Sequence, residues 1–158
     1  MVPLIVQLVV FLLLVTLGRL RRFQKSAYIE RKGAVSLGVL FVFTGIAHFT
    51  MTAEMASMFF EWVPYKTVLV WFSGGFEVAA GIALLAEARY EKPVGMLLII
   101  FLILAFPLNI HAALTDAKIG GGGPSYLLLR APLQLFWITW TWYYTVRRKK
   151  NALTTNVS

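Results

Sequence analysis

Six side chains that can donate, accept or carry a proton interrupt stretches that are otherwise apolar. They are His48, Glu77, Asn109, His111, Arg130 and Gln134. Polar and ionisable groups are costly inside long apolar segments and are candidates for a functional site there. The set supplies a carboxylate, a guanidinium, two imidazoles and two amides. Such groups can hydrogen-bond a small polar molecule, neutralise an anionic or carbonyl oxygen, and exchange a proton with it.

Two readings of this cluster stay open. In the first, the six residues line a ligand pocket in which Arg130 neutralises an oxygen atom and Glu77 holds Arg130 or exchanges a proton. Glu77 and Arg130 lie about two helical turns apart in depth, within reach of the long arginine side chain, so we expect an ion pair between them. In the second reading, the polar groups only specify how the helices pack.

The sequence lacks the patterns of a self-contained catalytic or metal site, so catalytic residues are left unassigned. The chain has no cysteine, which excludes thiol and disulfide chemistry within it. Ser73 lies near Glu77 without a suitably placed histidine for a triad. His48, His111 and Glu77 would need three different helices to form a metal site, and no short ligand spacing supports one. We therefore expect no metal.

The composition places the chain in a membrane. It has 158 residues, of which 59% are hydrophobic and 14% charged, and its mean hydropathy is +0.74. Soluble domains average roughly 45–50% apolar and about 25% charged residues. A soluble globular domain, a disordered tail and a disulfide scaffold are therefore excluded, and residues 1–158 are expected to form a single transmembrane domain.

Five segments are long and apolar enough to span the hydrocarbon core of a bilayer. They are about 2–17, 33–49, 67–86, 93–114 and 126–146. The last four each carry polar residues in the half that faces the same side. We therefore predict an all-α membrane protein with a four-helix transmembrane bundle and one extra N-terminal transmembrane helix packed outside it.

The net charge of +8 is an orientation signal. Most lysines and arginines lie in three segments, residues 19–32, 89–92 and 147–150. In a protein with five spans these segments lie on the same side of the membrane. The third segment begins a basic tail at residues 147–158. The positive-inside rule then places the N-terminus outside and the C-terminus in the cytoplasm. The expected charge partner is the anionic surface of the lipid bilayer, and no nucleic-acid binding is expected.

The outer connection before the third span has apolar residues at helical spacing, from Met51 and Met55 to Phe59 and Trp62, and ends at Pro64. We predict a short interfacial helix over residues 51–63 on the outer side. It is open whether this helix only connects two spans, covers a pocket as a lid, or docks a partner. Met55, Phe59 and Trp62 are the candidates for the lid or partner contact.

Four short motifs give the chain a resemblance to a known family. They are Gly45-Ile-Ala-His48-Phe49; Ser73-Gly74-Gly-Phe-Glu77 followed by Gly81 and Leu84-Leu85; Pro107-Leu-Asn109 followed by Ala112; and Arg130-Ala-Pro132-Leu133-Gln134. In this order and on these helices they resemble the DoxX-like family of small bacterial membrane proteins, over about Gly33 to Tyr144. The chain departs from that pattern in its extra N-terminal helix and in having no cysteine.

The resemblance implies a four-helix membrane bundle in the bacterial inner membrane. Some relatives of this kind are linked to thiosulfate–quinone oxidoreduction or to redox-enzyme complexes and their maturation. We therefore expect a pocket in the outer half of the membrane that binds a small polar or quinone-like molecule. The chain would serve as the membrane subunit of an oxidoreductase system, with a quinone as the candidate cofactor and another protein as its partner.

Two other functions are weighed against this expectation. One is an accessory or assembly subunit without catalytic activity, whose polar cluster specifies helix packing and whose segment 51–63 docks a partner. The other is a small carrier, which the lack of an inverted repeat and of a second broken helix disfavours. Glycine-rich helix faces also permit a homo-oligomer.

Overall fold

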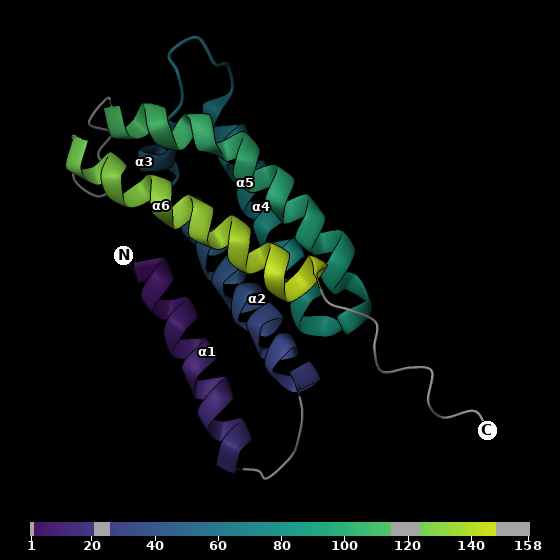
Figure 1. Ribbon diagram of the computed structural model, residues 1–158. Helices are drawn as coiled ribbons and strands as arrows, with labels where there is room; N and C mark the ends of the chain where they lie inside the picture. The colour runs from purple at the N-terminus through teal and green to yellow at the C-terminus, as the bar shows by residue number, and fades with distance from the viewer. Residues whose placement is uncertain (1, 21–25, 115–123, 148–158) are drawn as a thin grey trace.

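The computed structural model describes residues 2–20, 26–114 and 124–147, with side chains at 5–16, 31–112, 114 and 131–147. All regular elements within these residues are helices, which confirms the prediction of an all-α chain. The long helices run side by side along the length of the molecule (Figure 1). Apart from Arg147, the predicted basic tail at 147–158 lies outside the described residues.

The long helices agree with the predicted segments to within a few residues at most ends. They are α1 (Val2–Leu20), α2 (Ser26–Thr50), α4 (Lys66–Ala86), α5 (Glu91–Leu114) and α6 (Pro124–Thr141). A 3-10 turn, η1 (Ala88–Tyr90), precedes α5, and a π-helical turn, η2 (Trp142–Val146), ends α6. α2 begins earlier than predicted, because the helix continues through charged residues that a membrane-span criterion leaves out.

The predicted interfacial helix over 51–63 is only partly helical. Its helical portion, α3, covers Thr52–Ala56, and turns follow it up to Tyr65. Tyr65 has a left-handed backbone (φ 53°), which turns the chain into α4 directly after Pro64. The connecting segment, residues 51–65, therefore folds back over one end of the bundle, near the end of α5 (Figure 1). We call this the lid end.

Three helical stretches of the described chain have the length and composition to cross a membrane: Arg31–Thr50, Lys66–Ala86 and Ala88–Ala112. Large apolar side chains point outward from these helices, including Phe72 (75% exposed) and Leu104 (70% exposed). Large apolar side chains gathered on an outer surface fit contact with lipid. The count of five spans and the orientation of the termini remain predictions.

α2 and α4 approach so closely that their backbones nearly touch. A Cβ atom on Gly38 would lie 2.9 Å from the Gly81 carbonyl oxygen, and one on Gly81 would lie 2.7 Å from the Gly38 carbonyl oxygen. The pair Gly45 and Gly74 repeats this arrangement. A Cβ atom on Gly45 would lie 2.8 Å from the Gly74 carbonyl oxygen, and one on Gly74 would lie 2.9 Å from the Gly45 carbonyl oxygen. Seven residues separate the two glycines on each helix, so both pairs lie on the same helix face. Small residues at such contacts let membrane helices pack backbone to backbone.

The opposite end of the bundle is closed by α6, η2 and an ion pair. The Tyr144 ring packs on Gly33 of α2, and the Thr145 side chain packs on Gly95 of α5, where a side chain on either glycine would collide. Arg31 donates to Glu91 at 2.6 Å and to the Leu85 carbonyl oxygen at 3.2 Å. This arginine therefore joins the start of α2 to the end of α4 and the start of α5.

α1 lies along one side of the bundle, beside α2 and α6 (Figure 1). Its buried Gln7 accepts a hydrogen bond from Trp137 Nε1 at 2.9 Å, and Phe11 packs edge-on against Trp140. The other face of α1 exposes Ile5, Leu12 and other apolar side chains. α1 therefore packs one face on α2 and α6 and leaves the other exposed, while the four-helix bundle with one extra helix stays a prediction.

The glycine contact can be tested with an internal control. Replacing Gly81 by alanine places a methyl group against the Gly38 carbonyl oxygen, so α2 and α4 must separate, at a cost of roughly 1–3 kcal/mol. Gly75 on the same helix faces open space. We expect Gly81→Ala to lower the midpoint of thermal unfolding in detergent, and Gly75→Ala to leave it unchanged or raise it slightly. Equal destabilisation by both variants would contradict the proposed packing.

Candidate functional site

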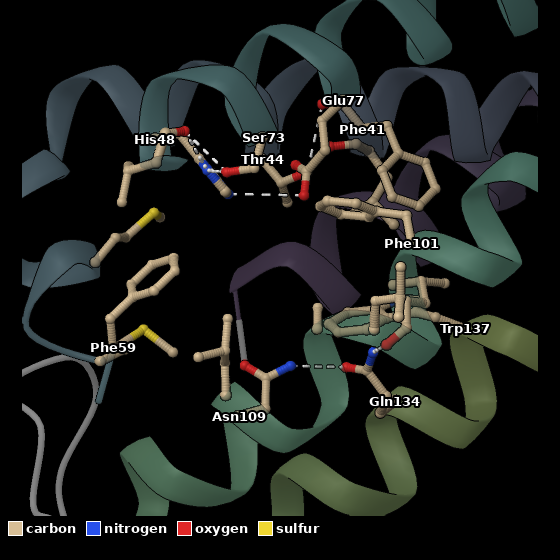
Figure 2. A pocket seen from close by; sticks show the side chains of 18 residues that line it. Phe41, Thr44, His48, Phe59, Ser73, Glu77, Phe101, Asn109, Gln134 and Trp137 are labelled. Atoms are coloured by element: carbon tan, nitrogen blue, oxygen red, sulfur yellow. Dashed lines mark hydrogen bonds and ion pairs between the residues drawn. The ribbon is translucent and has the colours of Figure 1, made fainter. Parts of the chain in front are cut away.

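A cavity of about 390 Å³ lies between α2, α4, α5 and α6 at the lid end of the bundle. Eighteen side chains line it, most of them apolar, with six polar ones among them. The polar ones are Thr44, His48, Ser73, Glu77, Asn109 and Gln134. Figure 2 shows that they form two groups on opposite sides of the cavity, one from α2 and α4 and the other from α5 and α6.

The first polar wall is built around Glu77, which is 7% exposed on α4. Thr44 Oγ1 on α2 donates to Glu77 Oε2 at 2.7 Å, a shorter contact than the one it makes with the Leu40 carbonyl oxygen of its own helix at 3.1 Å. His48 Nε2, one turn further along α2, lies 3.6 Å from the other carboxylate oxygen, Oε1. That distance is too long for a hydrogen bond, so the imidazole and the carboxylate face each other without a direct bond.

The His48 ring is held by its other nitrogen. Nδ1 lies 2.9 Å from Ser73 Oγ and 3.2 Å from the Val70 carbonyl oxygen, while Ser73 Oγ itself donates to that carbonyl at 2.8 Å. A carbonyl oxygen only accepts, and the serine proton is already used. The network is therefore satisfied when Nδ1 carries the proton. The neutral ring then presents the lone pair of Nε2 to Glu77 and the cavity.

The second polar wall is made of two amides. Asn109 Nδ2 on α5 donates to Gln134 Oε1 on α6 at 3.0 Å, and Gln134 Nε2 donates to the Leu102 carbonyl oxygen at 2.6 Å. Pro107 lies inside α5 between these contacts and has no N–H group for the helix ladder. Gln134, which is 3% exposed, thus ties α6 to the backbone of α5 beside the proline.

The two remaining ends of the cavity are apolar. Phe59 lies at one end (Figure 2), and Met55 and Met58 of the same connecting segment also line the cavity. Phe41, Phe101 and Trp137 lie at the other end (Figure 2). Flat aromatic surfaces therefore line the cavity on the side away from the lid end.

Four of the six predicted site residues meet in this cavity: His48, Glu77, Asn109 and Gln134. His111 does not line it, because its Nδ1 lies 3.0 Å from the Met58 carbonyl oxygen and its ring stacks on Phe60. His111 is therefore not among the residues that line this cavity, and it contacts the connecting segment instead. Arg130 belongs to α6, but its side chain lies outside the described part of the chain, so the predicted pair with Glu77 stays a prediction.

Two of the three predicted lid residues, Met55 and Phe59, line the cavity. Trp62 does not, since it is 79% exposed and stacks on Phe60 at the outer tip of the segment. Trp62 therefore lies at the surface of the segment, and its contact with a partner stays a prediction.

Thr44, Ser73 and the aromatic end of the cavity were not among the predicted site residues. Thr44 and His48 are four residues apart on α2, and Ser73 and Glu77 are four apart on α4, so helical spacing could have marked both polar pairs. Trp137 carried no such signal, because a tryptophan in an apolar segment is equally typical of a membrane interface.

The arrangement can hold a small, mainly apolar molecule with polar atoms on opposite sides. A cavity of this size falls in the usual range for small-molecule sites, roughly 300–1,000 Å³. Among the described residues, no group of three or more His, Asp or Glu side chains is placed to hold a metal ion. The chemistry at hand is hydrogen bonding and proton exchange through His48 and Glu77.

The Thr44–Glu77 contact gives a direct test of the first wall. Thr44→Val keeps the side-chain shape but removes the donor to the buried carboxylate, which we expect to cost roughly 1–3 kcal/mol of stability. Thr50→Val is the matched control, since the Thr50 hydroxyl is exposed and donates to the Ala47 carbonyl oxygen of its own helix. In a double-mutant cycle with Glu77→Gln, thermal unfolding should show coupling for Thr44 and none for Thr50. Additive effects at Thr44 would count against the contact.

No curated protein and no solved structure matches this chain. One family model, described as a domain of unknown function (DUF8561), matches residues 37–145. The matched stretch runs from α2 to η2, so it contains all the residues that line the cavity and leaves out α1. Because the match covers well over half of its length, the chain belongs to the DUF8561 family.

Proposed function

We propose that this chain is an integral membrane protein that binds a small ring-bearing molecule, quinone-like in shape, in the cavity at the lid end. The observation that carries the proposal is the pair of polar walls facing each other across an otherwise apolar cavity. One wall offers His48 and Glu77, and the other offers Asn109. A ring with oxygen atoms on opposite sides has the matching distribution of polar and apolar surface.

The apolar ends support this choice of ligand. Phe41, Phe101 and Trp137 offer flat surfaces against which a ring can stack, an arrangement aromatic groups favour. Met55 and Met58 on the lid side are flexible and can adapt to a substituent or a hydrocarbon tail. A ligand with a tail would reach the cavity from the surrounding lipid, and the exposed apolar faces of α4 and α5 support such a location for the chain.

In this proposal the chain is the membrane subunit of an oxidoreductase system in the bacterial inner membrane. Its N-terminus lies outside and its C-terminus in the cytoplasm. The chain would bind and orient the ligand, and a partner protein would exchange electrons with it. The redox role rests on the DoxX-like resemblance of the motifs, and the orientation rests on the distribution of Lys and Arg.

A second candidate function, an accessory subunit without a ligand, has one specific observation in its favour. Several polar groups of the walls already pair with each other, Thr44 with Glu77 and Asn109 with Gln134. Such pairs between helices are typical of packing contacts in membranes. The two functions differ in whether the protein retains a molecule in its cavity.

Native mass spectrometry of the protein, extracted gently from its own membranes, distinguishes the ligand-binding function from the accessory function. We expect one small molecule per chain, and we expect Glu77→Gln and Asn109→Leu each to lower its occupancy by about tenfold, which is what losing one buried hydrogen bond implies. Leu97→Met, on the lipid-facing side of α5, is the control and should keep the wild-type occupancy. If the purified protein carries no small molecule and the variants lose only stability, the accessory function is favoured over the binding function.

A further inference from the structure

Among the described side chains that line it, the cavity presents more free hydrogen-bond acceptors than donors, and this balance determines which ligand chemistry fits it. On the first wall, Thr44 already donates to Glu77 Oε2, which leaves Oε1 facing His48 Nε2. Because His48 Nδ1 uses its proton toward Ser73 and Val70, Nε2 carries a lone pair in the neutral ring. Because Nε2 and Oε1 lie 3.6 Å apart and do not bond each other, at least one of them is left as an acceptor without a donor when the pair carries one proton or none.

The second wall offers an acceptor as well. Asn109 uses one N–H group for Gln134 Oε1, and Gln134 uses its own amide group for the Leu102 carbonyl oxygen. Within the described part of the chain, no hydrogen bond occupies Asn109 Oδ1. Asn109 can therefore give a ligand one remaining N–H donor and one carbonyl acceptor.

A hydroxyl group on the ligand matches both walls, because it donates one hydrogen bond and accepts others. A carbonyl oxygen only accepts. It would use the donors but leave Asn109 Oδ1 and one atom of the His48–Glu77 pair unpaired against an apolar cavity. Sites built to bond a hydroxyl group reject analogues that lack it, because their own polar groups are then left buried without partners.

We propose that the pocket selects the reduced, dihydroxy form of a quinone-like ring over the oxidised, dicarbonyl form. One hydroxyl group lies beside His48 Nε2 and Glu77 Oε1, and the other lies beside the Asn109 amide. The ring stacks at the aromatic end formed by Phe101 and Trp137. This inference rests on the proposed function, and it adds the redox state of the ligand that the site holds.

Calorimetric titration of the purified full chain in detergent tests this selectivity with three decyl-tailed probes: a 1,4-benzoquinol kept reduced under argon with ascorbate, the corresponding 1,4-benzoquinone, and the dimethyl ether of the quinol. The ether keeps the ring and both oxygen atoms but cannot donate. We expect the quinol to bind at least about tenfold more tightly than the other two. Asn109→Leu should reduce that preference several-fold, and Leu97→Met should keep it.

The outcomes separate this inference from the function on which it rests. If the quinone or the ether binds as tightly as the quinol, the selectivity is wrong and the binding function stands. If none of the three probes binds, both are wrong. A preference that Asn109→Leu leaves unchanged would overturn the assignment of the second wall. The comparison of the three probes on the unmodified chain tests the selectivity for the quinol even if a variant fails to fold.

Discussion

The structure depends on the contact between the backbones of α2 and α4. The reciprocal glycine pairs, Gly38 with Gly81 and Gly45 with Gly74, bring the two helices to a separation that any side chain at these positions would increase. Thr44 and His48 lie beside the second pair on α2, and Ser73 and Glu77 lie beside it on α4. The short separation is what allows a threonine hydroxyl to reach a buried carboxylate and an imidazole to reach a serine. The first polar wall therefore depends on the positions of the glycines in α2 and α4.

The two ends of the bundle are built on different principles, and the cavity follows from the difference. At the end opposite the lid, side chains of η2 fill the space over Gly33 and Gly95, and Arg31 joins three helices through Glu91 and the end of α4. At the lid end, α5 and α6 are joined through the hydrogen-bonded side chains of Asn109 and Gln134. A contact between two side chains leaves more space between the helices than a contact between backbones, so space remains between the two polar walls. The connecting segment then covers that space with flexible side chains, held by His111.

The sequence predicted the helices well, because long apolar segments and the residues that interrupt them are local features. It also predicted that polar residues of four different helices would converge, since Glu77 and Gln134 have few alternatives to a shared interior. It did not indicate the position of His111, whose partner is a backbone carbonyl in the connecting segment, a contact that no spacing reveals. It overestimated the helix over 51–63, where apolar periodicity continues through residues that fold as turns. The π-helical turn that places Tyr144 and Thr145 has no sequence signal of its own.

The most direct test of a ligand pocket inside this bundle is photo-crosslinking followed by peptide mapping. A decyl-tailed benzoquinol with a diazirine on its ring would be irradiated with the full chain in native membranes, with and without excess unlabelled benzoquinol. The proposed pocket predicts labelling near Phe101 and Asn109 on α5 and near His48 on α2, and the competitor should suppress it. Labelling confined to outward-facing residues such as Phe72 and Leu97, and insensitive to the competitor, would contradict the pocket.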